Sequence, residues 1–279
     1  MKVPPLVSAS SGSPFDPGFA AAEFVRARRS AGSLSDYPGT VPPDLAAAYR
    51  CQDEAIELWD DAVVGWKVGW IPEPFSATFG AQRLVGPIFR RALRRLNGGL
   101  RIEAPVFEHG FAAIEAEFIF QLARDAPEDV VDWTAEEARR LVGAMHVGVE
   151  IASSPLQNIN DLGPAVIASD FGNNAGLLLG DAVADWQTRD LESLQCETRI
   201  DGAVVGRGSA ASVSGGPLAA LAFALALNAR RGRPLRGGDY VTTGAATGVH
   251  EIRVGQAAEA HFAGVGVVGC VVRSMTPVA

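Results

Sequence analysis

The sequence has few cysteines, no long apolar run and no excess of basic residues, and each shortage excludes a class of protein. Among 279 residues there are only three cysteines, Cys51, Cys196 and Cys270, which are odd in number and far apart. They form neither a disulfide framework nor the close spacing of a zinc site, and the four histidines show no metal-ligand spacing either. We therefore expect reduced thiols in a cytoplasmic protein.

The charge balance and the hydropathy pattern exclude further classes of protein. The 24 basic residues are outnumbered by 32 acidic ones, and the net charge of −8 argues against binding to nucleic acid or to an anionic membrane surface. The longest apolar stretch, residues 218–227, is too short to span a bilayer. The first 15 residues lack the apolar run of a signal peptide. We expect no nucleic-acid partner and no membrane partner.

Local signals predict two helices followed by a β-rich region. Asp16 and Pro17 suit the start of a helix that ends near Gly32, and a second helix is expected over residues 43–59. From residue 62 onward, short β-like runs alternate with glycine-rich turns, interrupted by helices that begin at Thr134 and near Pro217. The expected strands cover residues 63–68, 112–122, 147–152, 177–179, 197–200, 240–243, 257–262 and 265–272.

Many short strands with glycine turns fit a rolled sheet or a barrel better than a doubly wound fold. A hydrophobic content of 48% is enough for a sizeable core. We predict an α+β chain that is mainly β, with a small helical N-terminal region over residues 1–60 and a β-rich catalytic domain over residues 61–279.

Two glutamates one residue apart stand in an apolar segment, residues 111–120. Because side chains alternate between the faces of a strand, Glu115 and Glu117 point to the same side. Adjacent carboxylates repel each other, and burying them unpaired is costly. The pair is therefore either a solvated strand face or a site for a divalent cation.

Three more polar residues have apolar neighbours. Lys67, between Gly65 and Gly69, is either a solvated strand residue or a catalytic group that a ligand can approach closely. Glu150 lies in a second apolar strand, where an exposed position is less expected. Asp170 precedes another apolar strand and, taken alone, is a turn residue.

The order of these residues resembles a known family. Lys67 in Gly-Trp-Lys-Val-Gly, Glu115-Ala-Glu117, Glu150-Ile and Asp170 are followed by Gly208-Ser-Ala-Ala, Gly216-Pro-Leu and Thr243-Gly-Ala-Ala-Thr-Gly248. This pattern, over residues 45–272, is similar to that of the 2-keto-4-pentenoate hydratase and 4-oxalocrotonate decarboxylase family, within the fumarylacetoacetate hydrolase superfamily. The last motif lacks the lysine of a P-loop and no helix pattern follows it, so nucleotide binding there is excluded.

The resemblance implies a fold of the fumarylacetoacetase C-terminal type, bound Mg²⁺ or Mn²⁺, and 2-keto acid substrates. It also implies a homo-oligomer, with association with a related decarboxylase or hydratase subunit as a further expectation. By resemblance the metal ligands are Glu115, Glu117 and Glu150, and the catalytic lysine is Lys67. The residues expected at the substrate are Ser169, Thr243, Gly244 and Thr247.

The chemistry of these residue types agrees with the resemblance. Three carboxylates are hard oxygen ligands, which suit Mg²⁺ or Mn²⁺ rather than zinc. Such an ion stabilises the enolate form of a chelated 2-keto acid. A lysine beside the enol oxygen can stabilise charge or move a proton if burial and the metal lower its pKa.

The sequence also departs from the family pattern, mainly where the remote end of the substrate would lie. The family has an aspartate some twenty residues after the lysine, but residues 79–86 contain no acid. The family's Gly-x-Thr-Ser is replaced by Gly69-Trp-Ile-Pro72, and Ala152-Ser-Ser-Pro155 lacks the usual Asp and Arg. Asp170 is the best candidate to replace the missing acid, with a purely structural turn as the alternative.

Four activities remain open from the sequence. A hydratase acting on a 2-hydroxy-dienoate comes first and a decarboxylase second. A hydrolase of an acylpyruvate-type C–C bond would be favoured if His109 or His146 lay within reach of a metal-bound water. A non-catalytic partner subunit would explain the missing aspartate, but Lys67 and the three glutamates argue against it.

Overall fold

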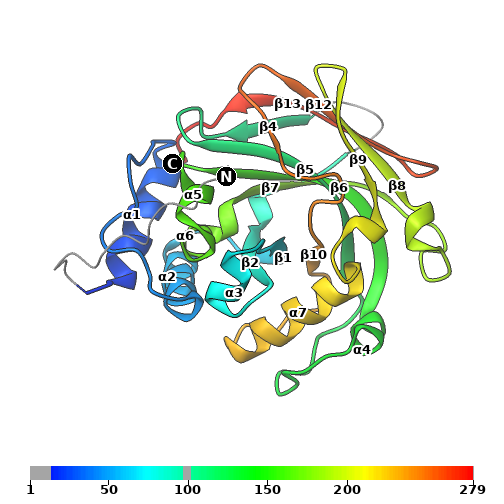
Figure 1. The fold of residues 1–279 in the computed structure, drawn as a ribbon, viewed down its shortest axis with the longest axis horizontal. Helices are drawn as coiled ribbons and strands as arrows, with labels where there is room; N and C mark the ends of the chain where they lie inside the picture. Colours follow the sequence, from blue (N-terminus) through cyan, green and yellow to red (C-terminus); the bar gives the residue numbers. More distant parts are fainter. Residues whose placement is uncertain (1–13, 97–101, 279) are drawn as a thin grey trace.

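The computed structural model describes residues 14–96 and 102–278, a part of the chain that contains two β-sheets and seven α-helices. The larger sheet has the strand order β2-β1-β10-β5-β6-β7-β3, with β11 paired to β5. The long central strands β5 and β6 curve around β1, β2 and β10 of the same sheet (Figure 1). Its strands are β1 Val63–Trp70, β2 Arg83–Phe89, β3 Leu93–Arg95, β5 Phe111–Leu122, β6 Val142–Ser154, β7 Asn174–Ala182, β10 Tyr240–Thr242 and β11 His250–Glu251.

The smaller sheet has five strands in the order β4-β13-β12-β8-β9. Phe118 of β5 contacts Phe262 of β12, with their ring centroids 5.6 Å apart, so the two sheets share one apolar core. The strands of this sheet are β4 Ile102–Val106, β8 Gln195–Ile200, β9 Ala203–Ser209, β12 Ala257–Phe262 and β13 Gly266–Ser274.

The N-terminal helices pack against each other and against the β-rich part of the chain. Asp16 caps α1, where its side chain accepts a hydrogen bond from the backbone N–H of Phe19. Gln52 of α2 is fully buried and donates to the backbone carbonyls of Val85 and Ala168. The helices are α1 Pro17–Arg29, α2 Leu45–Leu58, α3 Phe75–Phe79, α4 Ala135–Arg139, α5 Ile159–Leu162, α6 Pro164–Ser169 and α7 Pro217–Arg230.

The predicted α+β class with mainly β content is confirmed, and all eight expected strands are present. The sheets do not close into a barrel within the described residues: the larger one is an open, curved path that runs from β2 to β3. Strands β2, β3, β4, β9 and β11 were not expected. Pro87 and Pro105 interrupt β2 and β4, and Gly206 and Gly208 interrupt β9, which hides their strand pattern in the sequence.

The division at residue 60 stays a prediction. None of the helices in the described part of the chain has the length and hydropathy that a membrane crossing requires.

Candidate metal centre

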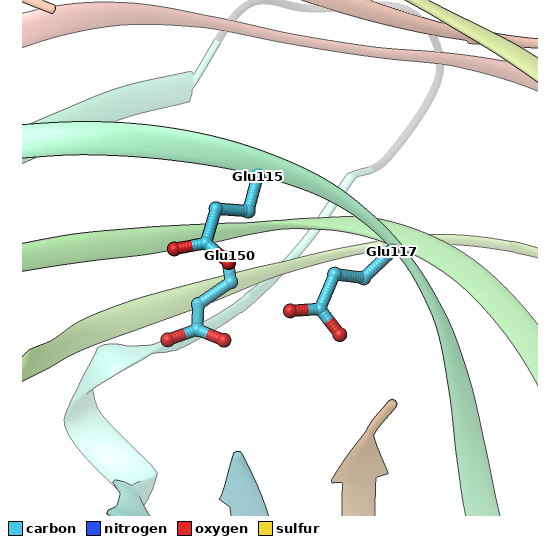
Figure 2. A group of neighbouring side chains, drawn as sticks. All are labelled: Glu115, Glu117 and Glu150. Carbon is cyan, nitrogen blue, oxygen red and sulfur yellow. The ribbon is translucent and has the colours of Figure 1, made fainter. Parts of the chain in front are cut away.

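Two neighbouring strands bring the three glutamates together. Glu115 and Glu117 lie on the same face of β5, and antiparallel pairing places Glu150 of β6 directly opposite Glu115. One carboxylate oxygen from each residue lies within 4.8 Å of the other two. Figure 2 shows the three carboxylates on the same side of the sheet, pointing into one space. The expected grouping of these residues is therefore present.

The three carboxylates are buried with less positive charge than would balance them. Glu117 and Glu150 are fully buried and Glu115 is 6% exposed. Lys67 of β1 supplies one cation, with Nζ 3.0 Å from Oε1 of Glu150. Burial raises the pKa of Glu115 to about 7, although Lys67 opposes the shift. Burial and the neighbouring carboxylates of Glu150 and Glu115 also raise the pKa of Glu117 well above its usual value.

The oxygen atoms of the cluster fit a divalent cation. Oε1 of Glu117 is buried without a hydrogen-bond partner, which is costly unless a cation binds it. The other oxygen of Glu117 accepts a 2.6 Å hydrogen bond from the backbone N–H of Gly244, which fixes the orientation of the carboxylate. Asn174 and Thr242 donate to the two oxygens of Glu150. These carboxylates could hold Mg²⁺ or Mn²⁺, which prefer hard oxygen ligands.

The two glycines that flank Lys67 serve different purposes. A Cβ atom on Gly65 would lie 2.2 Å from the carbonyl oxygen of Tyr240, so Gly65 permits the close pairing of β1 with β10. A Cβ on Gly69 would meet only ordinary contacts, and this residue lines the cavity beside the lysine. The expected open approach to Lys67 therefore exists on the Gly69 side alone.

Lys67 is held as a charged ammonium group. Burial by itself would lower its pKa, but the carboxylates of Glu150, Glu115 and Glu117 together raise it above the usual value. Its Nζ also donates a 3.1 Å hydrogen bond to Oδ1 of Asn173. Burial acts in the direction that the sequence analysis assumed, but the three surrounding carboxylates outweigh it.

Asp170 lies in a separate buried ion pair. Its Oδ1 accepts from Nε of Arg28, and the same guanidinium donates to the backbone carbonyls of Asp170, Ser153 and Asn174. Asp170 is not among the residues that line the cavity at Lys67. This placement supports the structural alternative for Asp170, whose role in water addition stays a prediction.

Two asparagines that follow Asp170 reach the site. Asn173, with a positive φ of 55°, contacts Lys67, and Asn174 contacts Glu150. Their positions depend on the 3₁₀ turn Phe171–Asn173, where Gly172 is left-handed and lies so close to Gly86 that a Cβ would clash. Sequence analysis did not assign them a role, although the polar run 169–174 before an apolar strand was the available signal.

None of the four residues expected at the substrate lines the cavity at Lys67, and their polar groups are engaged elsewhere. The Ser169 hydroxyl donates to the carbonyl of Ala165, and the Thr243 hydroxyl donates to the carbonyl of Phe118. The Thr247 hydroxyl is hydrogen-bonded to Thr198, and the N–H of Gly244 binds Glu117. Their contact with substrate stays a prediction.

A cavity of about 430 Å³ opens next to the metal cluster. Lys67, Glu115 and Asn173 are among the residues that line this cavity. Ala245 and Gly248, which belong to the loop after β10, also line it. Neither His109 nor His146 lines this cavity. His146 lies on β6 two residues from Gly148, the partner of Glu117, and its ring is hydrogen-bonded to the carbonyl oxygen of Gly180.

Comparison with known proteins identifies the family of the chain. The family model for the fumarylacetoacetate hydrolase C-terminal domain matches residues 88–273, and the chain belongs to this family. Two relatives match much of the chain. A 4-oxalocrotonate decarboxylase of Pseudomonas sp is 27% identical over 194 residues, 69% of this chain and 72% of the relative. A 2-keto-4-pentenoate hydratase of Burkholderia vietnamiensis is 25% identical over 250 residues, 88% of this chain and 93% of the relative.

Solved structures show the same fold. The 4-oxalocrotonate decarboxylase from Pseudomonas putida G7, complexed with magnesium and adipate, matches with a TM-score of 0.76 at 21% identity, covering 92% of this chain and 97% of that one. Fumarylpyruvate hydrolase from Pseudomonas aeruginosa, in complex with Mn²⁺ and pyruvate, matches with a TM-score of 0.54 at 17% identity, covering 75% of this chain and 89% of that one. The resemblance inferred from the motifs is confirmed.

Proposed function

We propose that this protein is a divalent-metal-dependent lyase acting on a 2-keto acid or its 2-hydroxy-dienoate form, with hydration of the 2-keto-4-pentenoate type as the first reaction. The observation that carries the proposal is the placement of Lys67 Nζ 3.0 Å from Glu150, within the cluster of buried glutamates and at the wall of one cavity. Both relatives named above are enzymes of this chemistry.

The residues divide into those that hold the metal and those that act on the substrate. Mg²⁺ or Mn²⁺ bound by Glu115, Glu117 and Glu150 would supply Lewis acidity toward the enolate oxygen of a keto acid. Lys67, held between Glu150 and Asn173, carries a positive charge beside that oxygen. It stabilises the negative charge that forms there and can donate a proton to it.

Decarboxylation is the second candidate, and the position of Asp170 favours it. Water addition needs a further acid or base near the remote carbons, but Asp170 is paired with Arg28 outside the cavity. Among the described residues that line the cavity, Lys67 and Glu115 are the only ionisable ones. Decarboxylation needs no base to activate water: the bond to the remote carboxylate breaks, CO₂ leaves, and the electron pair moves to the 2-oxygen before a proton is added.

The other two activities have less support. Hydrolysis of an acylpyruvate needs a base for water, and neither His109 nor His146 lies at the cavity. A silent partner subunit would not need Lys67 and three glutamates in this arrangement. Assembly as a homo-oligomer, or with a related subunit, is proposed from the family resemblance and is tested by measuring the mass in solution.

A panel of substrates tests the proposal. The protein is assayed with 2-hydroxy-dienoates, 4-oxalocrotonate and acylpyruvates, each with Mg²⁺ and with Mn²⁺, and the products are identified by mass spectrometry. A hydrated keto acid supports the hydratase, and release of CO₂ from 4-oxalocrotonate alone supports the decarboxylase. No turnover of any substrate would contradict the lyase proposal. Asp170→Asn should abolish hydration in folded protein only if Asp170 supplies the missing acid.

A further inference from the structure

The cavity beside the metal cluster has only two charged lining residues among the described ones, Lys67 and Glu115. Apart from Lys67, Glu115, Asn160 and Asn173, its lining is built from glycine, alanine, proline and larger apolar residues. The larger apolar side chains are Trp70, Ile71, Phe75, Leu84, Ile167 and Val249. The charged groups that can bind a keto acid thus belong to the glutamate cluster, and apart from the neutral amide of Asn160 the rest of the cavity offers mainly apolar surface.

No free cation faces this apolar part among the described lining residues. Lys67 is engaged with Glu150 and Asn173. Arg83 lies nearby, but its guanidinium stacks 5.2 Å from the ring centre of Trp70, donates to the carbonyl of Ser214, and does not line the cavity. A second carboxylate on the substrate would therefore lose water without gaining a cationic partner, which is unfavourable.

The apolar wall is fixed on one side and incompletely covered on the other. The ring of Phe75 lies against Gly163, where a Cβ would come within 3.0 Å of it, so α3 is packed on the corner between α5 and α6. Trp70 is 45% exposed and Val249 is 55% exposed, although both line the cavity. A volume of about 430 Å³ is within the range of pockets for ligands larger than a five-carbon acid, roughly 300–1,000 Å³.

We propose that the substrate is a monocarboxylic 2-keto acid, or its dienol, that carries an alkyl or aryl group at the end remote from the keto function. Trp70, Phe75, Ile167 and Val249 hold this group, and its binding covers the exposed faces of Trp70 and Val249. The inference rests on the proposed function, since it assigns the keto-acid end to the metal cluster. It places substrates of the hydratase type ahead of dicarboxylates such as 4-oxalocrotonate.

Binding of unreactive keto acids tests this inference separately from turnover. Mg²⁺-loaded protein is titrated by calorimetry with three compounds that differ only at carbon 5: 2-oxopentanoate, 2-oxo-5-phenylpentanoate and 2-oxohexanedioate. The phenyl compound should bind at least about tenfold more tightly than 2-oxopentanoate, the scale of selectivity that an apolar pocket provides. The dicarboxylate should bind no more tightly than 2-oxopentanoate.

A matched pair of variants sharpens the test. Val249→Arg adds a cation at an exposed position of the cavity, and should shift the affinity ratio by about tenfold in favour of the dicarboxylate over the phenyl compound. Val267→Arg adds the same charge to a valine of β13 that is 50% exposed and lies outside this cavity, so the ratio should stay unchanged.

Each outcome is decisive for one of the two proposals. Tighter binding of the dicarboxylate by the unmodified protein, equal binding of all three compounds, or no binding of any would overturn the inference about the tail. The lyase proposal is judged independently, by turnover of the dienoate panel. Selective binding of the phenyl compound without any turnover would support the inference of an apolar subsite and contradict the lyase proposal.

Discussion

Two groups of charged side chains are buried in the described part of the chain, and they differ in how their charges are balanced. In the first, Glu115, Glu117 and Glu150 surround the single amine of Lys67. In the second, Arg28 pairs with one carboxylate, and its remaining N–H groups donate to backbone carbonyls. The charges of the Arg28–Asp170 pair cancel without a ligand, although Oδ2 of Asp170 has no hydrogen-bond partner, and the pair joins α1 to the segment after α6. The unbalanced cluster can be neutralised by a divalent cation or by protons on its glutamates, and we propose it as the functional site.

The two groups are connected through one short segment. Asp170 accepts a hydrogen bond from Arg28. Three residues later Asn173 contacts Lys67, and the next residue, Asn174, contacts Glu150. The structural pair therefore helps to set the position of two asparagines at the metal cluster. A change in the pair should act mainly on stability, whereas a change in the cluster should act mainly on binding and turnover.

The largest effect is expected from removing the cation of the balanced pair. Arg28→Met should lower the free energy of unfolding by about 3–5 kcal/mol, because Asp170 is left as an uncompensated buried charge. Chemical denaturation measures this change. Arg26→Met is the control: its ion pair with Glu23 is on the same helix but exposed, so its loss should change the free energy of unfolding much less than the loss of Arg28. Equal effects of the two variants would contradict the structural role of the Arg28 pair.

Within the unbalanced cluster, Lys67→Met should mainly affect chemistry. We expect turnover of a good substrate to fall by roughly 10²-fold or more, the scale of a general acid–base group. The variant should stay folded, since removing the amine leaves carboxylates that bound Mg²⁺ can still neutralise. Steady-state kinetics and thermal unfolding with Mg²⁺ check both parts. Turnover close to normal would show that Lys67 is a structural residue.

A smaller effect is expected from pH in the metal-free protein. The pKa of Glu115 is raised from 4.5 to about 7 in the folded chain, so the folded state binds more protons than the unfolded state between these values. The free energy of unfolding should therefore fall as pH rises through this window, by on the order of 1 kcal/mol per pH unit for this group. Thermal unfolding in a chelator, with and without Glu115→Gln, measures the contribution.

Added Mg²⁺ should remove this loss of stability, because ionised carboxylates bind the ion and protonated ones do not. The stabilisation by Mg²⁺ should thus be larger at pH 8 than at pH 5. An equal stabilisation at both values would mean that the ion binds elsewhere.

Local patterns predicted the parts of the site that lie on single strands. The alternation along residues 111–120 placed Glu115 and Glu117 on one face, and this is confirmed. The partners that come from distant segments could not be predicted from spacing: Arg28 is 142 residues from Asp170, and Lys67 is 106 residues from Asn173. The sheet register that sets Glu150 opposite Glu115 is also a property of the folded chain.

The sequence was less informative where glycine and proline have structural roles. Gly65 was interpreted as room for a ligand, but it permits contact between β1 and the backbone of Tyr240. Gly86 and Pro87 weakened the strand pattern of β2, although this strand pairs with β1 along its length. In both cases glycine is required because two backbones that are distant in sequence approach each other closely. Local propensity contains no information about such a contact.

Binding of Mg²⁺ to wild type and to Glu117→Gln, measured by calorimetry, tests the central claim most directly. The variant should stay folded and lose at least about tenfold in affinity, because Glu117 presents the buried carboxylate oxygen that has no hydrogen-bond partner. Glu251→Gln, an exposed glutamate on β11 beside the same strand, should bind Mg²⁺ as the wild type does. Unchanged affinity of Glu117→Gln would contradict the assignment of the glutamate cluster as the metal site.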